Sequence, residues 1–253
     1  ISVYQPDVII FIDYPGFNMR IAKWARQEGY KNHYYISPQI WAWKEGRIKA
    51  IKQDVDAMYV ILPFEKQFYE EKHNFPVHFV GHPLIDEISA RTPVIPENFR
   101  KEHQLDERPI IALLPGSRKQ EIQKMLEIML SVTPDFPDYQ FVIAGAPSQD
   151  QDFYEPFLKK NRVHIVMNQT YNLLDVAHAA LVTSGTATLE TALFKVPEVV
   201  CYKGGRISYE IAKRVINLDY ISLVNLIMDR EVVKELIQTE FNTKTLKKAL
   251  AEI

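Results

Sequence analysis

The chain has 253 residues, about 1.7 times the length of an ordinary domain, so it holds one large domain or two modest ones. Apolar residues make up 47% and charged residues 25%, as in globular proteins, which excludes a disordered tail. The 30 basic and 32 acidic side chains give a net charge of −2, without the strong positive field of a nucleic-acid-binding protein.

Cysteine usage and the lengths of the apolar runs narrow the class further. Cys201 is the only cysteine, which excludes a disulfide framework and a multi-cysteine zinc site and fits a reducing cytosol. It lies in an apolar run and is expected to be inert packing. No apolar run approaches the roughly 20 residues that span a bilayer.

Short apolar runs alternate with amphipathic stretches along the chain. The expected strands are Asp7–Ile12, His33–Ile36, Ala57–Leu62, Val77–Val80, Ile110–Leu114, Gln140–Ala144, His164–Met167, Ala180–Thr183 and Glu198–Tyr202. The expected helices include Asn18–Gln27, Glu65–Lys72, Gln120–Leu130, Thr186–Phe194 and Ile207–Ile216. Several of these strands are continuously apolar, as strands covered by helices on both faces are. The alternation predicts an α/β fold with a mainly parallel sheet.

A link between two units is expected at about residues 91–108. Two prolines lie within 91–98, the charged stretch Phe99–Arg108 follows, and a new apolar strand starts after Pro109. We therefore expect two Rossmann-like units, one over residues 1–95 and one over residues 96–253. No internal repeat or low-complexity segment interrupts them.

The first chemically distinctive turn follows the first strand. Asp13 stands at the carboxyl end of that strand, the edge where ligands of open α/β sheets bind. Half desolvated by Tyr14 and Phe17, it is a candidate general base for a hydroxyl nucleophile. The alternative makes Asp13 an ordinary turn residue before Pro15, with Asn18 as a helix N-cap.

Two further strand ends in the first half carry aromatic or imidazole groups. Trp41 and Trp43 lie in a loop near Lys44, a composition that suits a lipid boundary or a binding wall. The alternative is that both tryptophans are core residues. His82 also follows a strand and can contact a phosphate or a sugar, although a lone histidine is commonly structural. The other histidines lack the spacing of a metal site.

A strand-to-helix turn over residues 113–121 offers a first anion site. The strand ends at Leu114, Gly116 turns the chain, and a helix is expected to begin near Ser117. A helix start presents unpaired backbone N–H groups and partial positive charge, and Arg118 adds a planar fork for phosphate. The alternative reading is a plain capping box of Ser117 with Gln120.

A second such turn follows the strand that ends at Thr183. The small residues Ser184, Gly185, Thr186 and Ala187, with Thr188, allow close approach of a ligand and supply hydroxyl donors. Glu190 lies one turn deeper on the helix, where a carboxylate can accept hydrogen bonds from a ribose diol. The alternative is an ordinary small-residue helix start, with Glu190 favouring the helix dipole.

Neither turn carries a familiar nucleotide fingerprint. The GxxxxGK[ST] and GxGxxG patterns are both absent, and the serines show no nucleophile elbow. The two turns together indicate a nucleotide that is held without ATPase or dehydrogenase machinery.

Seven blocks in order along the chain resemble the lipid-A-disaccharide synthase family of bacterial glycosyltransferases. They are Phe11–Asn18, Ser37–Trp43, Leu62–Glu65, Val80–Leu84, Leu114–Arg118, Ser184–Glu190 and Tyr220–Leu226. Each block alone is a weak signal, but seven in the family's order are specific.

The resemblance implies a GT-B fold, two Rossmann-like lobes facing each other across a cleft. It implies an inverting transfer from UDP-2,3-diacylglucosamine to 2,3-diacylglucosamine 1-phosphate that forms a β-1,6 disaccharide and releases UDP. In that mechanism Asp13 corresponds to the base near the acceptor's 6-hydroxyl. The helix starts at Ser117 and Thr186, with Arg118, offer positive potential for the departing diphosphate.

The resemblance also suggests further roles. Glu190 falls where glycosyltransferases of this fold hold the ribose, and Asn225 is a further candidate near the donor. No obligatory divalent cation and no cofactor are expected. Because both substrates carry acyl chains, Trp41 and Trp43, with Lys44, Arg47 and Lys49, are expected to contact the cytoplasmic face of the inner membrane, with Asn18 and His82 also on the acceptor side.

Two departures from the family pattern stand out. The family's first strand, turn and helix do not precede Ile1, and its carboxy-terminal helices do not follow Ile253. The chain is therefore expected to be the middle of a longer enzyme, with its amino-terminal lobe incomplete. A UDP-sugar epimerase or hydrolase of the same shape, or an inactive nucleotide-sugar-binding fragment, are the alternatives.

Overall fold

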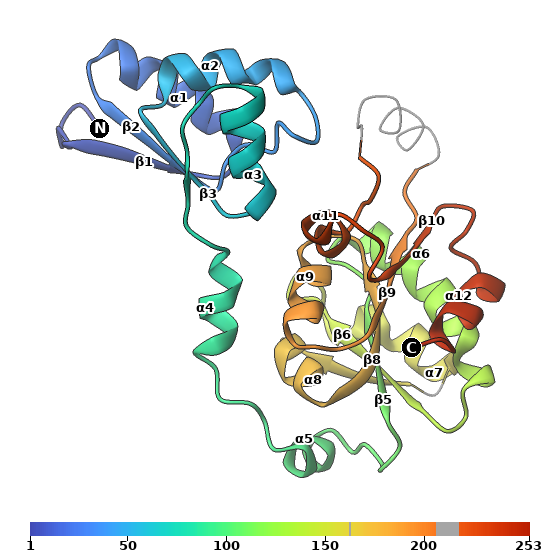
Figure 1. Ribbon diagram of the computed structural model, residues 1–253. Coiled ribbons are helices and arrows are strands. Elements are labelled where there is room, and N and C mark those ends of the chain that lie inside the picture. The colour runs from blue at the N-terminus through green and yellow to red at the C-terminus, as the bar shows by residue number, and fades with distance from the viewer. Residues whose placement is uncertain (162, 206–217) are drawn as a thin grey trace. The chain divides into compact units, whose positions relative to one another are not determined.

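The protein is described by a computed structural model that covers residues 1–161, 163–205 and 218–253, and these form two compact units. Unit 1 holds residues 1–87 with Leu218, and unit 2 holds the remainder from Ile88 onward. Each unit has its own sheet of parallel strands (Figure 1), as expected from the sequence. The segment before the predicted boundary at residue 95 belongs to unit 2, because Arg91 and Val94 both bond to Asp175.

Unit 1 is a four-stranded sheet in the order β1-β2-β3-β4. Its elements are β1 (Val8–Ile12), α1 (Pro15–Gln27), β2 (Lys31–Tyr35), a 3-10 turn η1 (Glu45–Arg47), α2 (Ile48–Asp54), β3 (Ala57–Val60), α3 (Pro63–Gln67), a π-helical turn η2 (Phe68–Lys72), β4 (His78–Phe79) and the start of α4 (Pro83–Ser89). Ile12 pairs with Tyr35, and Tyr35 with Tyr59, so the strands' carboxyl ends share one edge.

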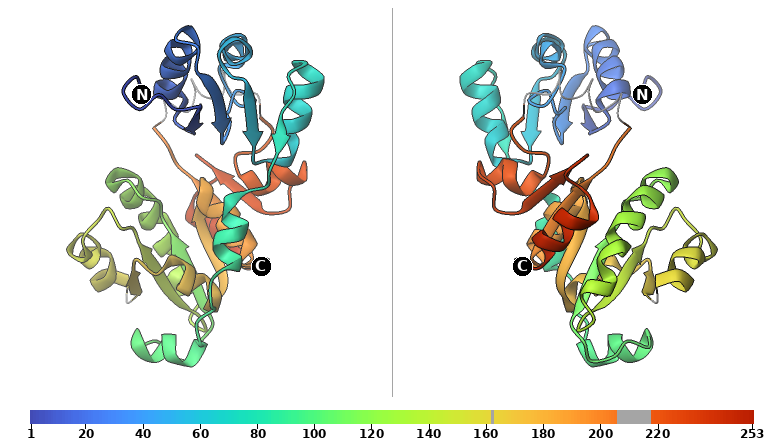
Figure 2. Two further views of the ribbon diagram at one scale, coloured as in Figure 1. Left: turned by 90° about the vertical axis from the view of Figure 1, so that its left-hand side faces the viewer. Right: turned by 90° about the vertical axis from the view of Figure 1, so that its right-hand side faces the viewer.

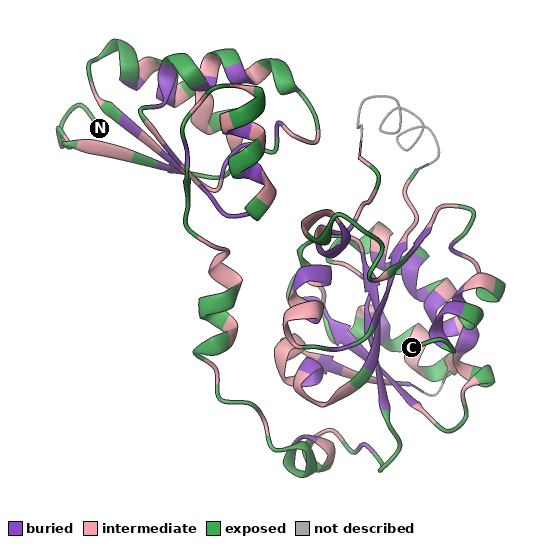
Figure 3. Cartoon of the chain, in the orientation of Figure 1, coloured by how far each residue is buried: buried purple, intermediate pink, exposed green. Residues whose placement is uncertain are grey.

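The core of unit 1 lies on the face that α1 and α2 cover. Phe11, Tyr34 and Met58 from three adjacent strands pack there, against apolar residues of the helices. On the other face of β1, Ile10 and Ile12 are more than half exposed. The sheet of unit 1 therefore has its core on one face, and buried and exposed residues alternate along its elements (Figure 3).

Unit 2 is a six-stranded parallel sheet in the order β10-β9-β8-β5-β6-β7. Its elements are α5 (Pro96–Glu102), β5 (Ile110–Leu114), α6 (Lys119–Met129), the 3-10 segment η3 (Leu130–Asp135), β6 (Gln140–Gly145), α7 (Gln151–Asn161), β7 (His164–Met167), α8 (Thr170–Val176), β8 (Ala177–Thr183), α9 (Thr186–Leu193), β9 (Glu198–Tyr202), α11 (Leu223–Met228), β10 (Lys234–Ile237) and α12 (Thr243–Leu250). Helices cover both faces of this sheet (Figure 2).

Alternate residues of the central strands of unit 2 enter two separate cores. Leu113 and Leu181 belong to the core beneath α6, α7 and α12, whereas Ala112 and Val182 belong to the core beneath α8 and α9. Both faces must therefore be apolar, which explains why these strands read as continuous hydrophobic runs.

The nine expected strands are all present, with ends that differ by at most three residues. The four expected helices that fall on described residues are present too, while Ile207–Ile216 lies outside the described residues. Strand β10 was missed, because Lys234 and Glu235 break its apolar pattern. Within the described part of the chain, no helix combines the length and the apolar character that crossing a bilayer requires.

Glu198, the first residue of β9, is an unusual feature of the unit 2 core. It is 2% exposed, and neither carboxyl oxygen has a hydrogen-bond partner among the described residues. Burial therefore raises its pKa from 4.5 to about 9, so the folded state holds the neutral acid.

Glu198→Gln is expected to stabilise the protein more at pH 8 than at pH 5. The folded state retains a proton that the unfolded chain releases above about pH 4.5, so the free energy of unfolding falls as pH rises from about 4.5 to about 9. Glutamine removes this dependence on pH. We expect the free energy of unfolding to rise by roughly 2–4 kcal/mol at pH 8 and by under about 1 kcal/mol at pH 5. Urea denaturation at both pH values measures it.

Glu127→Gln is the matched control, because Glu127 is exposed on α6 and should change little at either pH. An equal effect of Glu198→Gln at pH 5 and pH 8 would show that Glu198 is ionised in the folded protein.

Candidate functional site

A cavity of about 460 Å³ lies at the carboxyl edge of the unit 2 sheet. Its wall is formed by the ends of β5, β6 and β8 and by the first turn of α9. The residues that line it are Leu114, Pro115, Gly116, Ser117, Arg118, Glu121, Ala144, Ala146, Pro147, Thr170, Thr183, Ser184, Gly185, Thr186, Ala187 and Glu190. The two turns singled out in the sequence therefore meet in one cavity.

The first turn leads from β5 into α6. Gly116 has φ +98°, a conformation that strongly favours glycine, and a Cβ atom there would also lie 2.5 Å from Oε2 of the Glu121 side chain. Helix α6 begins at Lys119 with extended Arg118 as its N-cap and no side-chain cap, so the alternative capping box of Ser117 with Gln120 is wrong. The first-turn N–H groups of α6 are thus left for a ligand or solvent.

Charge near this turn is mixed but mainly positive. The Glu121 carboxylate lies beside Gly116 and opposes an anion there. Arg118 is exposed and has no ion pair within the described residues, and it also lines an adjoining cavity of about 400 Å³ together with Lys119, Lys124 and Lys203. Taken together, the two adjoining cavities are lined by these four cations and by two carboxylates, Glu121 and Glu190, and this excess of positive charge favours an anionic ligand at this edge.

The second turn leads from β8 into α9. Gly185 has φ +157° and ψ −161°, a conformation that side-chain-bearing residues rarely adopt, and nothing lies within 4 Å of its Cβ position. Thr186 and Ala187 form the first turn of α9, whose N–H groups have no helical partner. The open space at Gly185 lets a ligand approach those groups closely.

The structure sorts the hydroxyls of the second turn by availability. Ser184 donates to the Ile221 carbonyl at 3.1 Å, and Thr188 donates to the Gly185 carbonyl at 2.9 Å. Thr186 forms no hydrogen bond through its hydroxyl within the described residues. Ser184 and Thr188 therefore stabilise the loop through these bonds, and donation of these hydroxyls to a phosphate stays a prediction.

Thr183 is a residue of this cavity that the sequence argument missed. It is 5% exposed, it lines both cavities, and its Oγ1 has no hydrogen-bond partner in the part of the chain described. A buried hydroxyl without a hydrogen-bond partner costs about 1–3 kcal/mol, so such a group is unusual in a strand of a well-packed core. Thr183 is the last residue of an apolar strand and directly precedes the small-residue turn, and this position in the sequence could have identified it as a residue of the site.

Glu190 projects from α9 into the same cavity. Its Oε1 accepts a hydrogen bond of 3.0 Å from the Tyr171 hydroxyl, and its Oε2 has no bond among the described residues. The carboxylate can therefore accept hydrogen bonds from a ligand while it is held by Tyr171.

Asn225 does not line either cavity. It is fully buried, its amide nitrogen donates to Glu235 and the Val233 carbonyl, and its amide oxygen accepts from two backbone N–H groups. Glu235 also accepts from Ser222 and from the N–H of Ile221, whose carbonyl receives Ser184. Asn225 thus contributes to the support of the β8–α9 turn instead of facing a ligand.

Asp13 stands at the corresponding edge of unit 1, in a strained turn. Asp13 and Tyr14 both have positive φ, 46° and 43°. The Asp13 carbonyl accepts hydrogen bonds from Tyr34 Oη at 2.6 Å and Asn18 Nδ2 at 2.7 Å. Burial raises the pKa of Tyr34 to about 12, so its hydroxyl remains a donor. Strain that is held by such bonds is a mark of functional turns.

Two expectations about this turn are wrong. Helix α1 has Tyr14 as its N-cap, so Asn18 lies inside the helix and bonds back to the turn. Asp13 is exposed because Tyr14 and Phe17, which were expected to desolvate it, are 70% and 55% exposed. The Asp13 carboxylate has no hydrogen-bond partner within the described residues.

The two tryptophans of the aromatic loop, Trp41 and Trp43, differ in their surroundings. Trp41 packs edge-on against Phe64, at 5.0 Å between ring centroids, and its indole nitrogen donates to Glu65 at 3.1 Å. The same buried carboxylate accepts from Ser37 at 2.7 Å and from the N–H groups of Ile61 and Leu62. Two of the sequence blocks are thus joined through one residue, Glu65.

Trp43 faces solvent and carries cations on its ring. It is 43% exposed, with Lys44 Nζ 4.2 Å and the Arg47 guanidinium 5.5 Å from a ring centroid. We call Trp43, Lys44 and Arg47 the Trp43 patch. The expectation of a surface formed by both tryptophans is corrected to one formed by Trp43, because Trp41 is committed to Glu65 and Phe64.

His82 directly precedes α4 in unit 1. Its Nδ1 accepts from the N–H of Leu84 at 3.2 Å, and partial burial lowers its pKa, which favours the neutral ring. The ring acts locally as a helix cap, and its other nitrogen has no bond among the described residues.

Comparison with known proteins places the chain among close relatives. The family profile described as "Lipid-A-disaccharide synthetase" matches residues 1–253. The chain is 44% identical over 241 residues to a lipid-A-disaccharide synthase of Coxiella burnetii, covering 93% of this chain and 63% of that protein. It is 40% identical over 252 residues to one of Syntrophus aciditrophicus, covering 97% and 65%. The chain therefore spans a little under two thirds of the length of these relatives.

Solved structures share the fold at low sequence identity. The "S. aureus MnaA-UDP co-structure" aligns with a TM-score of 0.66 and 12% identity, over 100% of this chain and 68% of that one. The UDP-GlcNAc 2-epimerase from Methanocaldococcus jannaschii aligns with a TM-score of 0.59 and 15% identity, over 100% and 71%. These likenesses bear out the α/β architecture of two Rossmann-like units on parallel sheets.

Proposed function

The chain belongs to the lipid-A-disaccharide synthase family, and on this premise we propose that it carries the donor site and part of the acceptor site of an inverting glycosyltransferase. The donor is UDP-2,3-diacylglucosamine and the acceptor is 2,3-diacylglucosamine 1-phosphate. The observation that carries the proposal is the meeting of both small-residue turns with Arg118 and Glu190 in one cavity.

UDP occupies the unit 2 cavity in this proposal. The diphosphate lies against the N–H groups that begin α6 and α9, with Arg118 on its oxygens and Gly116 and Gly185 giving room for contact. The ribose diol donates to Glu190. Asn225 is a positioning residue in this scheme, acting through Glu235 and the Ile221 carbonyl that holds Ser184.

The reaction is a single displacement at the anomeric carbon of the donor. The acceptor's 6-hydroxyl oxygen attacks that carbon while Asp13 takes the hydroxyl proton. The bond from the anomeric carbon to the β-phosphate oxygen breaks, UDP departs, and the configuration inverts. The helix starts stabilise the negative charge that develops on the leaving diphosphate.

Support for Asp13 as the base comes from its backbone. The turn is fixed through the Asp13 carbonyl by Tyr34 and Asn18, which leaves the carboxylate free to meet a hydroxyl. Asn18 thus acts on the acceptor side as a positioning residue. Contacts of the acceptor with Trp41 or His82 remain predictions from the sequence.

Asp13→Asn is expected to lower the transfer rate by about 10²–10⁴-fold while the Kd for UDP stays within about twofold. The asparagine keeps the turn, because the bonds from Tyr34 and Asn18 go to the backbone carbonyl. Mass spectrometry of the disaccharide formed from both substrates measures transfer, and calorimetry measures UDP binding. Asp7→Asn, an exposed aspartate before β1, is the matched control.

Three results would contradict this proposal. Normal transfer by Asp13→Asn would remove Asp13 from the role of base. Release of free sugar or an epimer without disaccharide would favour a hydrolase or epimerase. Tight UDP binding without turnover would mark the chain as a binding fragment.

We further propose that the Trp43 patch contacts an anionic lipid surface, at the cytoplasmic face of the inner membrane. Both substrates are amphiphilic, so the site must be brought to the membrane. An exposed indole flanked by two cations suits the boundary between headgroups and acyl chains.

Trp43→Ala is expected to weaken binding to vesicles that contain anionic phospholipid by about tenfold, because one large aromatic side chain is lost from the interface. Vesicle co-sedimentation measures it, and transfer between short-acyl substrates should be retained. Tyr4→Ala is the control, since Tyr4 is 84% exposed in the same unit. Unchanged vesicle binding by Trp43→Ala would remove the patch from this role.

A further inference from the structure

Tyr171 lies outside the cavity wall but bonds directly to a residue of that wall. It is the second residue of α8, and its hydroxyl donates to Glu190 Oε1 at 3.0 Å. A glutamate side chain has three rotatable bonds and samples many positions when it is unrestrained. One fixed oxygen leaves the second oxygen aimed in a restricted direction, so the partner of Glu190 controls what the carboxylate can meet.

The ring of Tyr171 contacts two side chains, Phe194 and Arg91. Its centroid is 5.2 Å from that of Phe194 at the end of α9, and the Arg91 guanidinium lies 5.3 Å from both rings. Cation–π contacts of this kind contribute about 0.5–2 kcal/mol and favour one ring orientation. These contacts hold the ring whose hydroxyl donates to Glu190.

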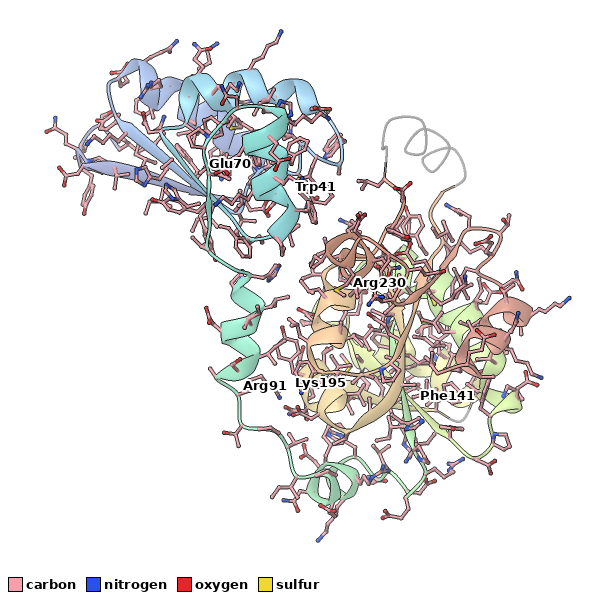
Figure 4. All side chains as sticks on the ribbon, viewed as in Figure 1. Trp41, Glu70, Arg91, Phe141, Lys195 and Arg230 are labelled. Atoms are coloured by element: carbon pink, nitrogen blue, oxygen red, sulfur yellow. The ribbon has the colours of Figure 1, made fainter. Side chains whose placement is uncertain are left out.

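Arg91 is held in turn by the polar residues of α8. It donates to Asn172 Oδ1 at 2.7 Å and to Asp175 Oδ2 at 3.3 Å, and the side chains of Arg91 and Asp175 are 19% and 9% exposed. Asp175 also accepts from the N–H of Val94 at 3.1 Å. This fixes Arg91 on a segment that otherwise runs as a linker between α4 and α5 (Figure 4).

We propose that Tyr171, held by Arg91, is a positioning residue that sets the Glu190 carboxylate for a ribose diol and so makes the site select ribonucleotides over deoxyribonucleotides. This inference rests on the proposed UDP site and adds two residues that do not touch the ligand. The specificity arises because a hydrogen bond from a 2′-hydroxyl to a carboxylate depends on the carboxylate's direction as well as its charge.

The test compares the affinities of UDP and 2′-deoxy-UDP for the full chain and its Tyr171→Phe variant by calorimetry. Phenylalanine keeps the ring, its contact with Phe194 and its place beside Arg91, and removes only the hydroxyl. We expect the wild type to prefer UDP by about tenfold or more. Tyr171→Phe should weaken UDP binding about three- to tenfold and leave the affinity for 2′-deoxy-UDP within about twofold. The ratio of the two affinities should therefore become smaller.

Tyr139→Phe is the matched control, because Tyr139 belongs to the same unit and contacts Phe136 and His178 instead of the cavity. Arg91→Ala is expected to narrow the UDP to 2′-deoxy-UDP ratio as well, and an unchanged ratio there would remove Arg91 from the proposal. If Tyr171→Phe kept the wild-type ratio of UDP to 2′-deoxy-UDP affinity, the positioning role of Tyr171 would be wrong. If the wild type bound neither nucleotide, the proposed UDP site itself would be wrong.

Discussion

The parallel pairing of β5 with β6 and β8 is the constraint on which the rest of unit 2 depends. Leu113 pairs with Ile143 on one side and with Leu181 on the other, so three strands end together. Each strand end must then be followed by a turn at the same edge, and two of these turns enter helices. The unpaired N–H groups that begin α6 and α9 therefore line one cavity, so the backbone alone brings hydrogen-bond donors together there.

Side chains then refine what the sheet supplies. Glycine at 116 and 185 permits backbone conformations that other residues rarely adopt, and Arg118 adds a positive charge to a cavity that also holds the carboxylates of Glu121 and Glu190. Behind them lie polar residues that do not line the cavity. Asn225 and Glu235 brace the β8–α9 turn, whereas Tyr171 holds Glu190. Unit 1 repeats this arrangement on a smaller scale, with Tyr34 and Asn18 holding the turn at Asp13.

The sequence predicted the strands well because buried parallel strands leave an unmistakable apolar run. It also located both turns of the cavity, since a strand, small residues and a helix follow one another in the chain. Partners distant in sequence were not predictable, such as Tyr171 for Glu190 or Glu65 for Trp41. The part taken by Asn225 depends on β10, whose charged residues hid the strand, and the exposure of Asp13 depends on how Tyr14 and Phe17 pack.

In the proposed function, a uridine nucleotide binds at the carboxyl edge of the unit 2 sheet. Hydrogen–deuterium exchange of the full chain with and without UDP tests this most directly. We expect slower exchange on UDP addition in peptides that cover residues 114–121 and 184–190, because the helix-start N–H groups there become hydrogen-bonded. Unchanged exchange in both segments under saturating UDP, or protection confined to other strands, would contradict it.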